Sequence, residues 1–454
     1  MNNNGKSYTV PFVSLIFLFF MWGFMTVLND ILIPYLKGAF HLNHVKAMLI
    51  QFAFFGAYFI GSLIYFTISI VSGDPINRIG YKKGLIWGLI ISALGALLFY
   101  PAAQFHVYGF FLSALFVMGL GFTLLQIAAN PYVAILGDEK SASARLNLAQ
   151  GFNSLGTTIG PVIGGYLIFT FFKDAHGSDA VKVPYLVFSM IFLLLAVFIF
   201  KMPLPRFTSS EQVEKGWGAL RYRQLVFGMI AIFMYVGGEV SIGSMMIGFL
   251  EIPKIAGLTA AEASKYVAFY WGGQMIGRFL GAVSLSNIKQ KRLKYLLMTA
   301  IPVAAYLVIV AGNGFHNANI YAVFLIINFI AFMLGKSVPQ RTLYIFAFIN
   351  ILLLASALLN GGKVAMWSVI GIGLFNSIMW SNIFTLAIAG LGKHTSQGSS
   401  LLVMMILGGA ILPVIMGAVA DAFGVQASYI VPVFSYIYIA FYGINGYKPY
   451  SVKV

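Results

Sequence analysis

Residues 9–36 read TVPFVSLIFLFFMWGFMTVLNDILIPYL, an apolar run that is interrupted by one acid, Asp30. A helix crosses the hydrocarbon core of a bilayer with about 20 apolar residues, so this run is long enough to span it. It is too long for the apolar part of a signal peptide and is expected to stay as the first helix. A second acid, Glu239, lies inside FMYVGGEVSIGSMMI (233–247). Because an ionisable group at membrane depth is costly, both acids are predicted to be functional.

The composition extends this prediction to the whole chain. It is 60% hydrophobic and 9% charged, whereas soluble domains carry about 25% charged residues. The apolar runs are continuous rather than alternating, which favours helices over a β-barrel. There are no cysteines, which excludes disulfides and thiol chemistry. The chain is therefore predicted to be an all-α membrane protein.

Fourteen apolar runs are separated by polar breaks. They are 9–37, 47–72, 83–103, 107–136, 143–171, 184–202, 224–250, 261–286, 293–312, 319–336, 341–359, 364–391, 398–420 and 425–446. The 28 Lys and Arg exceed the 12 Asp and Glu, but they are scattered through short loops without a basic arm, so nucleic acid is not an expected partner. Most of these Lys and Arg lie in loops and ends on the same side of the membrane as the N-terminus. The positive-inside rule then places both termini in the cytoplasm.

A repeated stretch divides the chain. LGTTIGPVIGG (155–165) matches LGGAILPVIMG (407–417) at seven of eleven positions, 252 residues apart. The same offset places Gly119-x-Gly121 on Gly371-x-Gly373. Parallel repeats of this kind are a transporter design. The repeat and the hydrophilic stretch after helix 6 predict an N-terminal six-helix half (1–202), a cytoplasmic linker (203–223) and a C-terminal half (224–454).

The repeat also locates an insertion. It pairs the fifth run with the thirteenth, whereas a simple six-plus-six duplication would pair the fifth with the eleventh. One extra helical hairpin is therefore predicted in the second half, at about 288–340. Inserting two helices keeps the direction of every later helix, in agreement with the distribution of basic residues.

The first cytoplasmic loop carries a motif. GDPINRIGYKK (73–83) follows the pattern G-x3-[D/N]-R-x-G-x-[KR]-[KR], which resembles the signature of the major facilitator superfamily between helices 2 and 3. Its members here are assigned to a gating motif: Gly73, Asn77, Arg78, Gly80, Lys82 and Lys83. Asn77 stands where that family usually has Asp, so the charge of the motif is weakened. Arg145 and Arg278 are expected at cytoplasmic helix ends, as gating contacts or as topology signals.

Five longer stretches narrow the resemblance. They are NDILIPYLK (29–37), AANPYVAILG (128–137), RLNLAQGFNSLG (145–156), GLFNSIMWSNIFTLAI (373–388) and SQGSSLLVMMILGGAILP (396–413). The chain resembles the fucose–galactose–glucose:proton symporters of that superfamily, and especially their bacterial glucose/galactose branch. The resemblance implies a major facilitator fold, two halves around a central cavity, alternating access, and import of a hexose by proton symport across a bacterial inner membrane.

The resemblance also implies roles for single residues. Asp30 falls on the family's helix-1 aspartate, which takes part in proton coupling and sugar binding. Asn153 falls on an asparagine associated with the sugar site. Gln126 replaces a helix-4 glutamate of the fucose carriers and cannot titrate. We therefore expect Glu239 to supply the second carboxylate, for proton coupling, sugar binding or both.

Amides and aromatic rings along the helices complete the predicted sugar site, since amides match hydroxyl donors and acceptors. Its members are Asn29, Gln126, Asn130, Gln150, Asn153, Glu239, Tyr270, Gln274, Asn376, Trp380 and Asn382. Each amide has an alternative role as a bond between neighbouring helices.

Other functions stay open at this point. A sodium-coupled carrier of a sugar or an amino sugar such as N-acetylglucosamine uses the same residue types. A membrane sugar sensor that does not transport is a different class. An enzyme is not expected, because no H-E-x-x-H, G-x-S-x-G or Cys/His group is present. No cofactor or metal is expected beyond the coupling proton or sodium. The expected partners are a sugar and the lipid bilayer, and the expected state is a monomer.

Overall fold

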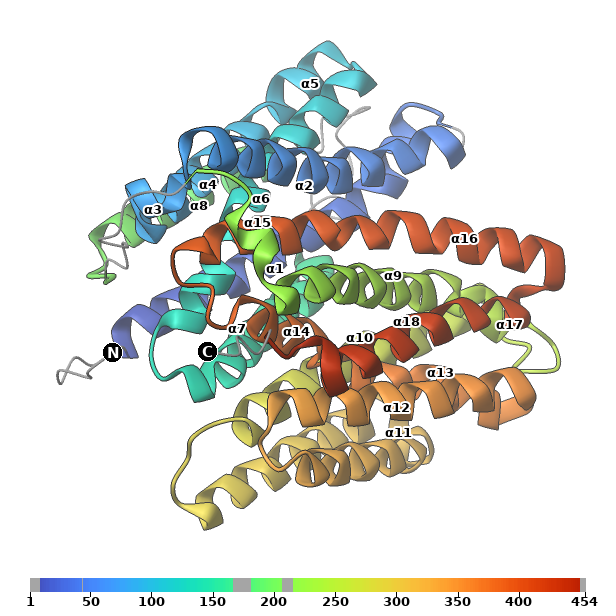
Figure 1. Cartoon of the computed structure of the whole chain (residues 1–454). Coiled ribbons are helices and arrows are strands. Elements are labelled where there is room, and N and C mark those ends of the chain that lie inside the picture. The colour runs from blue at the N-terminus through green and yellow to red at the C-terminus, as the bar shows by residue number, and fades with distance from the viewer. Residues whose placement is uncertain (1–8, 43, 166–180, 206–214, 450–454) are drawn as a thin grey trace. The chain divides into compact units, whose positions relative to one another are not determined.

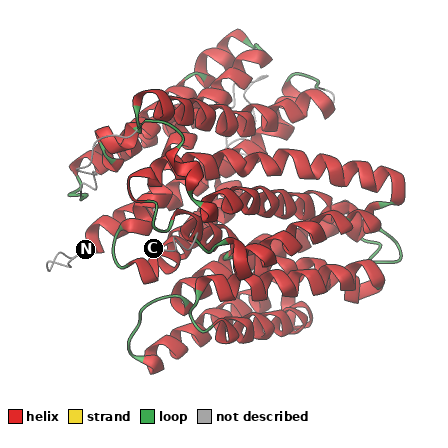
Figure 2. Ribbon diagram, in the orientation of Figure 1, coloured by secondary structure: helices red, strands yellow, loops and turns green. Residues whose placement is uncertain are grey.

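The computed structural model describes residues 9–42, 44–165, 181–205 and 215–449. In these ranges all regular structure is helical, as Figure 2 shows. The first helices are α1 (Thr9–Ala39), α2 (His44–Ser72), α3 (Pro75–Ile79), α4 (Tyr81–Leu97), α5 (Phe99–Phe105), α6 (Tyr108–Ile135), η1 (Glu139–Ser141), α7 (Ala142–Gly165) and α8 (Lys182–Lys201). The prediction of an all-α protein is confirmed.

The later helices begin after the stretch 203–215. They are η4 (Gly218–Arg221), α9 (Arg223–Glu251), α10 (Ala260–Ser284), α11 (Lys291–Gly335), α12 (Pro339–Leu359), α13 (Gly362–Asn376), α14 (Met379–Ile388), η5 (Gly392–His394), α15 (Thr395–Met404), η6 (Met405–Leu407), α16 (Gly408–Phe423), α17 (Val425–Ser428), α18 (Ile430–Phe441) and η7 (Tyr442–Gly446).

Twelve segments in the described residues are long and apolar enough to cross a membrane. Two further helices, α7 and α10, have 24 and 25 residues, which is also long enough, but they are less apolar. Together these make the fourteen helices that the sequence predicts. Polar residues such as Asn153 in α7 and Gln274 in α10 lower the hydropathy of these two helices.

The inserted hairpin corresponds to α11. Its 45 residues are two helices that meet at Gly314, where φ is 75°. This backbone conformation suits glycine, because it has no Cβ to clash. The two parts give separate candidate spans, Lys291–Gly312 and Gly314–Gly335. The first part is only 11% buried, so most of its side chains face outward.

The helices divide into two compact units. Unit 1 holds Met1–Gly137, Phe152–Ala219 and Gly390–Met404, and unit 2 holds Asp138–Gly151, Leu220–Ala389 and Met405–Val454. The boundary therefore passes through α7, whose first part belongs to unit 2. The stretch with α15 belongs to unit 1, although it follows the helices of unit 2 in the sequence.

Equivalent helices pack alike inside each unit. In unit 1, α6 packs against α2 and α4, and α4 also packs against α8. In unit 2, α13 packs against α10 and α12, and α12 also packs against α18. Figure 1 shows α9, α16 and α18 side by side in unit 2. This correspondence follows the sequence repeat and leaves α11 as the element without an equivalent in unit 1.

Glycines set the closest helix crossings. On α10, Gly273, Gly277 and Gly281 recur every four residues, and a Cβ at each would collide with the side chain of Tyr321, Ser377 or Ile378, respectively. At Gly373 of α13 a Cβ would lie 2.1 Å from the carbonyl oxygen of Tyr270. Small residues allow such close approach between membrane helices. The crossing brings the polar residues of α10 next to Asn376.

Candidate functional site

Glu239 is held by two tyrosines of unit 2. The Tyr235 hydroxyl donates to Oε1 of Glu239 at 2.6 Å, one helical turn away on α9. The Tyr270 hydroxyl of α10 donates to the backbone carbonyl of Glu239 at 3.0 Å. Both tyrosines are fully buried, whereas Glu239 itself is partly accessible. A carboxylate that is held by a hydroxyl and keeps partial accessibility can receive a sugar hydroxyl or a proton.

Asn376 links this acid to three more helices. Its Nδ2 donates to the Tyr270 hydroxyl at 2.9 Å. Its Oδ1 accepts from Tyr436 of α18 at 2.7 Å and from Asn350 of α12 at 3.0 Å. Asn376 is fully buried, so these bonds satisfy it in place of water. Asn376 therefore helps to hold Tyr270, whose hydroxyl contacts Glu239.

One face of α10 carries Tyr270, Gln274 and Arg278, each four residues after the last. Such spacing places side chains on the same side of a helix. Nη2 of Arg278 donates to Oε1 of Gln274 at 3.3 Å. The carboxylate of Glu239 interacts electrostatically with Arg278 and with the Gln274 amide. The carboxylate of Glu239, the guanidinium of Arg278 and the amide of Gln274 thus lie together within unit 2.

Arg278 lies deeper than the sequence analysis expects. It stands six residues before the end of α10, and its Nε donates at 3.3 Å to the carbonyl of Ser377. Ser377 is in the break between α13 and α14, where a carbonyl lacks its ordinary helical partner. Arg278 therefore belongs with Glu239 rather than with a helix end.

Trp380, Asn382 and Gln150 are also in unit 2. The indole nitrogen of Trp380 is buried without a hydrogen-bond partner, and its ring stacks on Phe384. Asn382 is fully buried, accepts from Asn147 at 3.1 Å and donates to the carbonyl of Pro339 at 3.1 Å. These bonds fit the interhelical role better than sugar binding. Gln150 is buried in the first part of α7.

In unit 1 the predicted amides lie on α6 and α7. Gln126 is buried, and both its amide and the indole of Trp22 interact with the hydroxyl of Tyr58. Asn130 is fully buried and donates to the backbone carbonyl of Gln126 at 3.1 Å. This cluster offers a tryptophan N–H and an amide, as sugar sites do.

Asn153 lies where α7 crosses α1. Its Nδ2 donates to the carbonyl of Phe19 at 3.0 Å. Cβ atoms at Gly23 and Gly156 would strike the opposite backbone at about 2 Å, so the two helices touch here. Asn29 and Asp30 lie in α1, but their side chains lie outside the described part of the chain.

The loop after α2 forms a polar junction in unit 1. Asp74 caps α3, accepting from the backbone nitrogens of Ile76 and Asn77, and also accepts from Ser396 at 2.6 Å and from Tyr65. Asn77 donates to the carbonyl of Lys393. Burial raises the pKa of the Asp74 carboxyl above its ordinary value of 3.8, although these hydrogen bonds oppose the shift. The junction ties the motif loop to the start of α15.

The other motif residues make local contacts. Gly73 and Gly80 have φ near +84°, which favours glycine. Arg78 donates to the carbonyl of Ser72, and Lys82 donates to that of Met202 at 2.7 Å. Lys83 is exposed. In unit 2, Arg145 donates to the carbonyl of Asp138 and to Ser141 near the start of α7.

The sequence does not identify Tyr436, Asn350 or Asp74 as site residues. Tyr436 and Asn350 come from helices that carry no other predicted site residue, and only the fold brings them to Asn376. Asp74 sits in the quoted motif, three positions before Asn77, and its position before Pro75 is a helix-cap signal. Among the described residues, no group of three or more His, Cys, Asp or Glu could hold a metal ion.

Comparison with known proteins decides the family. Residues 13–343 match the sequence profile of the Major Facilitator Superfamily. The chain belongs to the major facilitator superfamily. It is 44% identical to a glucose/galactose transporter of Brucella abortus over 98% of this chain and 95% of that protein. It is 32% identical to the L-fucose-proton symporter of Escherichia coli over 92% and 89% of the two chains.

The solved structures agree. The crystal structure of the major facilitator transporter FucP in the outward conformation has a TM-score of 0.77 and 30% identity, covering 97% of this chain and 99% of that one. The fold class predicted from the sequence is therefore confirmed, as is the resemblance to this branch of the superfamily. This chain is a multi-pass membrane transporter of the major facilitator type, not an enzyme.

Proposed function

We propose that this major facilitator protein carries a hexose of the glucose or galactose type across the bacterial inner membrane together with protons. The observation that carries the proposal is Glu239, an acid in a membrane-spanning helix that Tyr235 holds while part of its surface stays accessible. An ionisable residue in such a place marks a substrate or proton pathway. The two names among its relatives, a glucose/galactose transporter and a fucose–proton symporter, support the same chemistry.

Sugar binding is assigned to polar groups in both units. In unit 2, Glu239 and Gln274 accept and donate to hydroxyls, and the free indole N–H of Trp380 offers a donor. In unit 1, Gln126 and the indole N–H of Trp22, both beside the Tyr58 hydroxyl, offer the same groups. A buried donor without a partner is costly in the empty protein, and a sugar hydroxyl would remove that cost.

Proton coupling is assigned to Asp30 and Glu239. Asp30 takes this role from its match to the helix-1 aspartate of the symporter family. Arg278 acts on Glu239 as a fixed counter-charge, so that the site need not hold an uncompensated carboxylate when the proton leaves. We further infer, from the distribution of basic residues, that both termini are cytoplasmic, and that the carrier works as a monomer.

Uptake into liposomes under one imposed gradient at a time tests this function. We expect radiolabelled glucose or galactose to accumulate when the outside is acidic, and not under a sodium gradient at equal pH. Competition by unlabelled glucose, galactose, fucose and N-acetylglucosamine then ranks the substrates. Accumulation that follows sodium alone would contradict proton coupling, and preference for N-acetylglucosamine would contradict the hexose assignment.

A further inference from the structure

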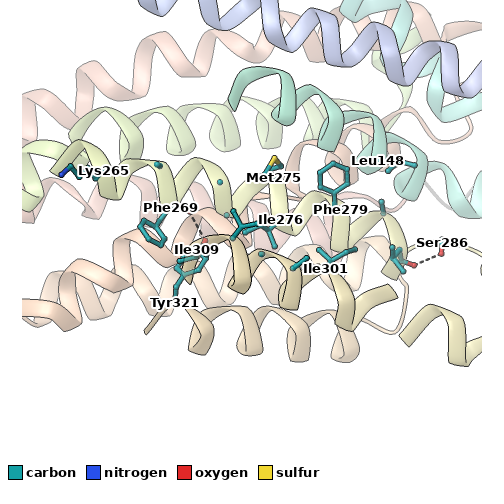
Figure 3. A pocket seen from close by; sticks show the side chains of 18 of the residues that line it. Leu148, Lys265, Phe269, Met275, Ile276, Phe279, Ser286, Ile301, Ile309 and Tyr321 are labelled. Carbon is teal, nitrogen blue, oxygen red and sulfur yellow. Dashed lines mark hydrogen bonds between the residues drawn. The ribbon is translucent and has the colours of Figure 1, made fainter. Parts of the chain in front are cut away.

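Unit 2 contains a long cavity that the proposed sugar site does not use. Its volume is about 680 Å³, and it lies between α10 and the first helix of α11, with Leu148 of α7 on one side. Figure 3 shows Lys265 at one end and Ser286 at the other. These two residues are 21 positions apart on or near one helix, which corresponds to about 30 Å at 1.5 Å per residue. The cavity is therefore a narrow slot about as long as the hydrocarbon core is thick.

The slot and the proposed sugar site occupy different faces of α10. Its lining on this helix includes Phe269, Gly272, Ile276, Phe279 and Val283, which recur every three or four residues. Tyr270, Gln274 and Arg278, which belong to the site at Glu239, do not line it. One helix thus separates a polar site from an apolar slot.

The lining is apolar along its length. The opposite wall is formed by Ile301, Ala304, Ala305, Val308 and Ile309 of α11. The Tyr321 hydroxyl donates to the carbonyl of Phe269 at 3.0 Å, and Ser286 donates to the carbonyl of Val283 at 2.6 Å. Water needs two or more polar partners in a buried position, and these walls offer few. The occupant should itself be apolar and extended.

Small residues on the two helices leave the space of the slot open. A Cβ added at Gly272 would meet no atom within 4 Å. Ala268, Ala304 and Ala305 also leave room between the two helices. Because the first helix of α11 is only 11% buried, a filler in the slot would supply the packing that this helix lacks.

We propose that the end of the slot next to Lys265 binds an acyl chain of a membrane phospholipid, whose phosphate lies at the exposed ammonium of that residue. The bilayer supplies this molecule at high concentration next to the outward-facing helix. A lysine at the end of an apolar surface keeps its charge in the head-group layer and attracts phosphate. The bound chain braces α11 against α10 and so stabilises the helix that presents Tyr270, Gln274 and Arg278.

Filling the slot should displace the lipid. Gly272→Leu places a side chain in the open space, and Gly248→Leu on α9 is the matched control, since a Cβ there also meets nothing within 4 Å. We expect native mass spectrometry of the full chain in mild detergent to show one phosphatidylglycerol per chain in the wild type and in Gly248→Leu. We expect at least a tenfold lower bound fraction in Gly272→Leu. Ala268→Leu, one turn away, replaces Gly272→Leu if the latter does not fold.

A second measurement separates the head group from the chain. Dioleoyl phosphatidylglycerol added to delipidated protein should raise the melting temperature, and Lys265→Gln should reduce that rise, whereas Lys254→Gln in the loop before α10 should not. Oleate alone should give little effect. Equal lipid retention in the wild type and Gly272→Leu, or an equal rise with oleate, would overturn the proposal. Neither readout requires transport, so the proposal stands or falls apart from the proposed function.

Discussion

At the scale of single residues, Glu239 depends on the hydroxyl that fixes it. A hydrogen bond to a charged group contributes about 1.5–3 kcal/mol, and the bond from Tyr235 is short at 2.6 Å. We expect Tyr235→Phe to weaken sugar binding by about tenfold or more, because the carboxylate then loses its orientation. Tryptophan fluorescence titration with glucose and galactose measures the change.

Tyr429→Phe is the matched control for this prediction. The Tyr429 hydroxyl is buried in the same unit but has no hydrogen-bond partner, so its removal should leave sugar binding unchanged. Equal binding by Tyr235→Phe and the wild type would show that the Tyr235–Glu239 bond does not support the site.

Asp74 should make the stability of the protein depend on pH. Its pKa is raised in the folded protein by burial, so the folded state binds this proton more tightly than the unfolded state does. The stability from this group is then full at low pH and falls as pH rises from about 4 through the raised pKa. The Asn side chain of Asp74→Asn does not titrate, so this loss of stability does not occur in the variant. We expect its melting temperature, relative to the wild type, to increase between about pH 4 and pH 7.

Asp421→Asn, at an exposed position of α16, serves as the control for the pH series. This variant makes the same change of net charge as Asp74→Asn, but outside the polar junction around Asp74. If Asp74→Asn instead becomes relatively less stable as pH rises, the hydrogen bonds to Asp74 outweigh its burial.

At the scale of helices, α10 and α13 cross at very short range. Gly373→Ala would push a methyl group to 2.1 Å from the Tyr270 carbonyl, and overpacking of this kind costs about 1–3 kcal/mol. We expect a lower melting temperature together with weaker sugar binding, since Tyr270 and Asn376 share this crossing. Gly248→Ala, where the methyl group has open space, should change neither. A normal melting temperature for Gly373→Ala would show that the crossing relaxes without cost.

The sequence predicts the helices well because membrane spans are long and uniformly apolar. It misses their breaks, since the interruptions at Asn376–Met379 and at Met405–Leu407 lie in apolar stretches without a proline at the break. It predicts the face of α10 only in part: Tyr270 and Gln274 follow from their spacing, but Arg278 looks like a topology signal until its bonds to Gln274 and Ser377 are known. The role of Asp74 depends on Ser396, 322 residues away, which no local pattern reveals.

At the scale of the whole molecule, duplication explains the order of helices and the insertion explains the difference between the two halves. The internal repeat predicts that α11 has no counterpart, and the packing within each unit agrees with this. The low burial of its first helix is the feature that leaves room for the lipid slot. The direction of the termini rests on the basic residues alone and stays a prediction.

The central claim is that sugar and proton move together through this carrier. Adding glucose or galactose to the outside of lightly buffered proteoliposomes, with no imposed gradient, tests it directly with a pH electrode. We predict a sugar-dependent rise of external pH for the wild type and none for Asp30→Asn, which should still exchange labelled for unlabelled sugar. Sugar entry by the wild type without any change of external pH would contradict the account.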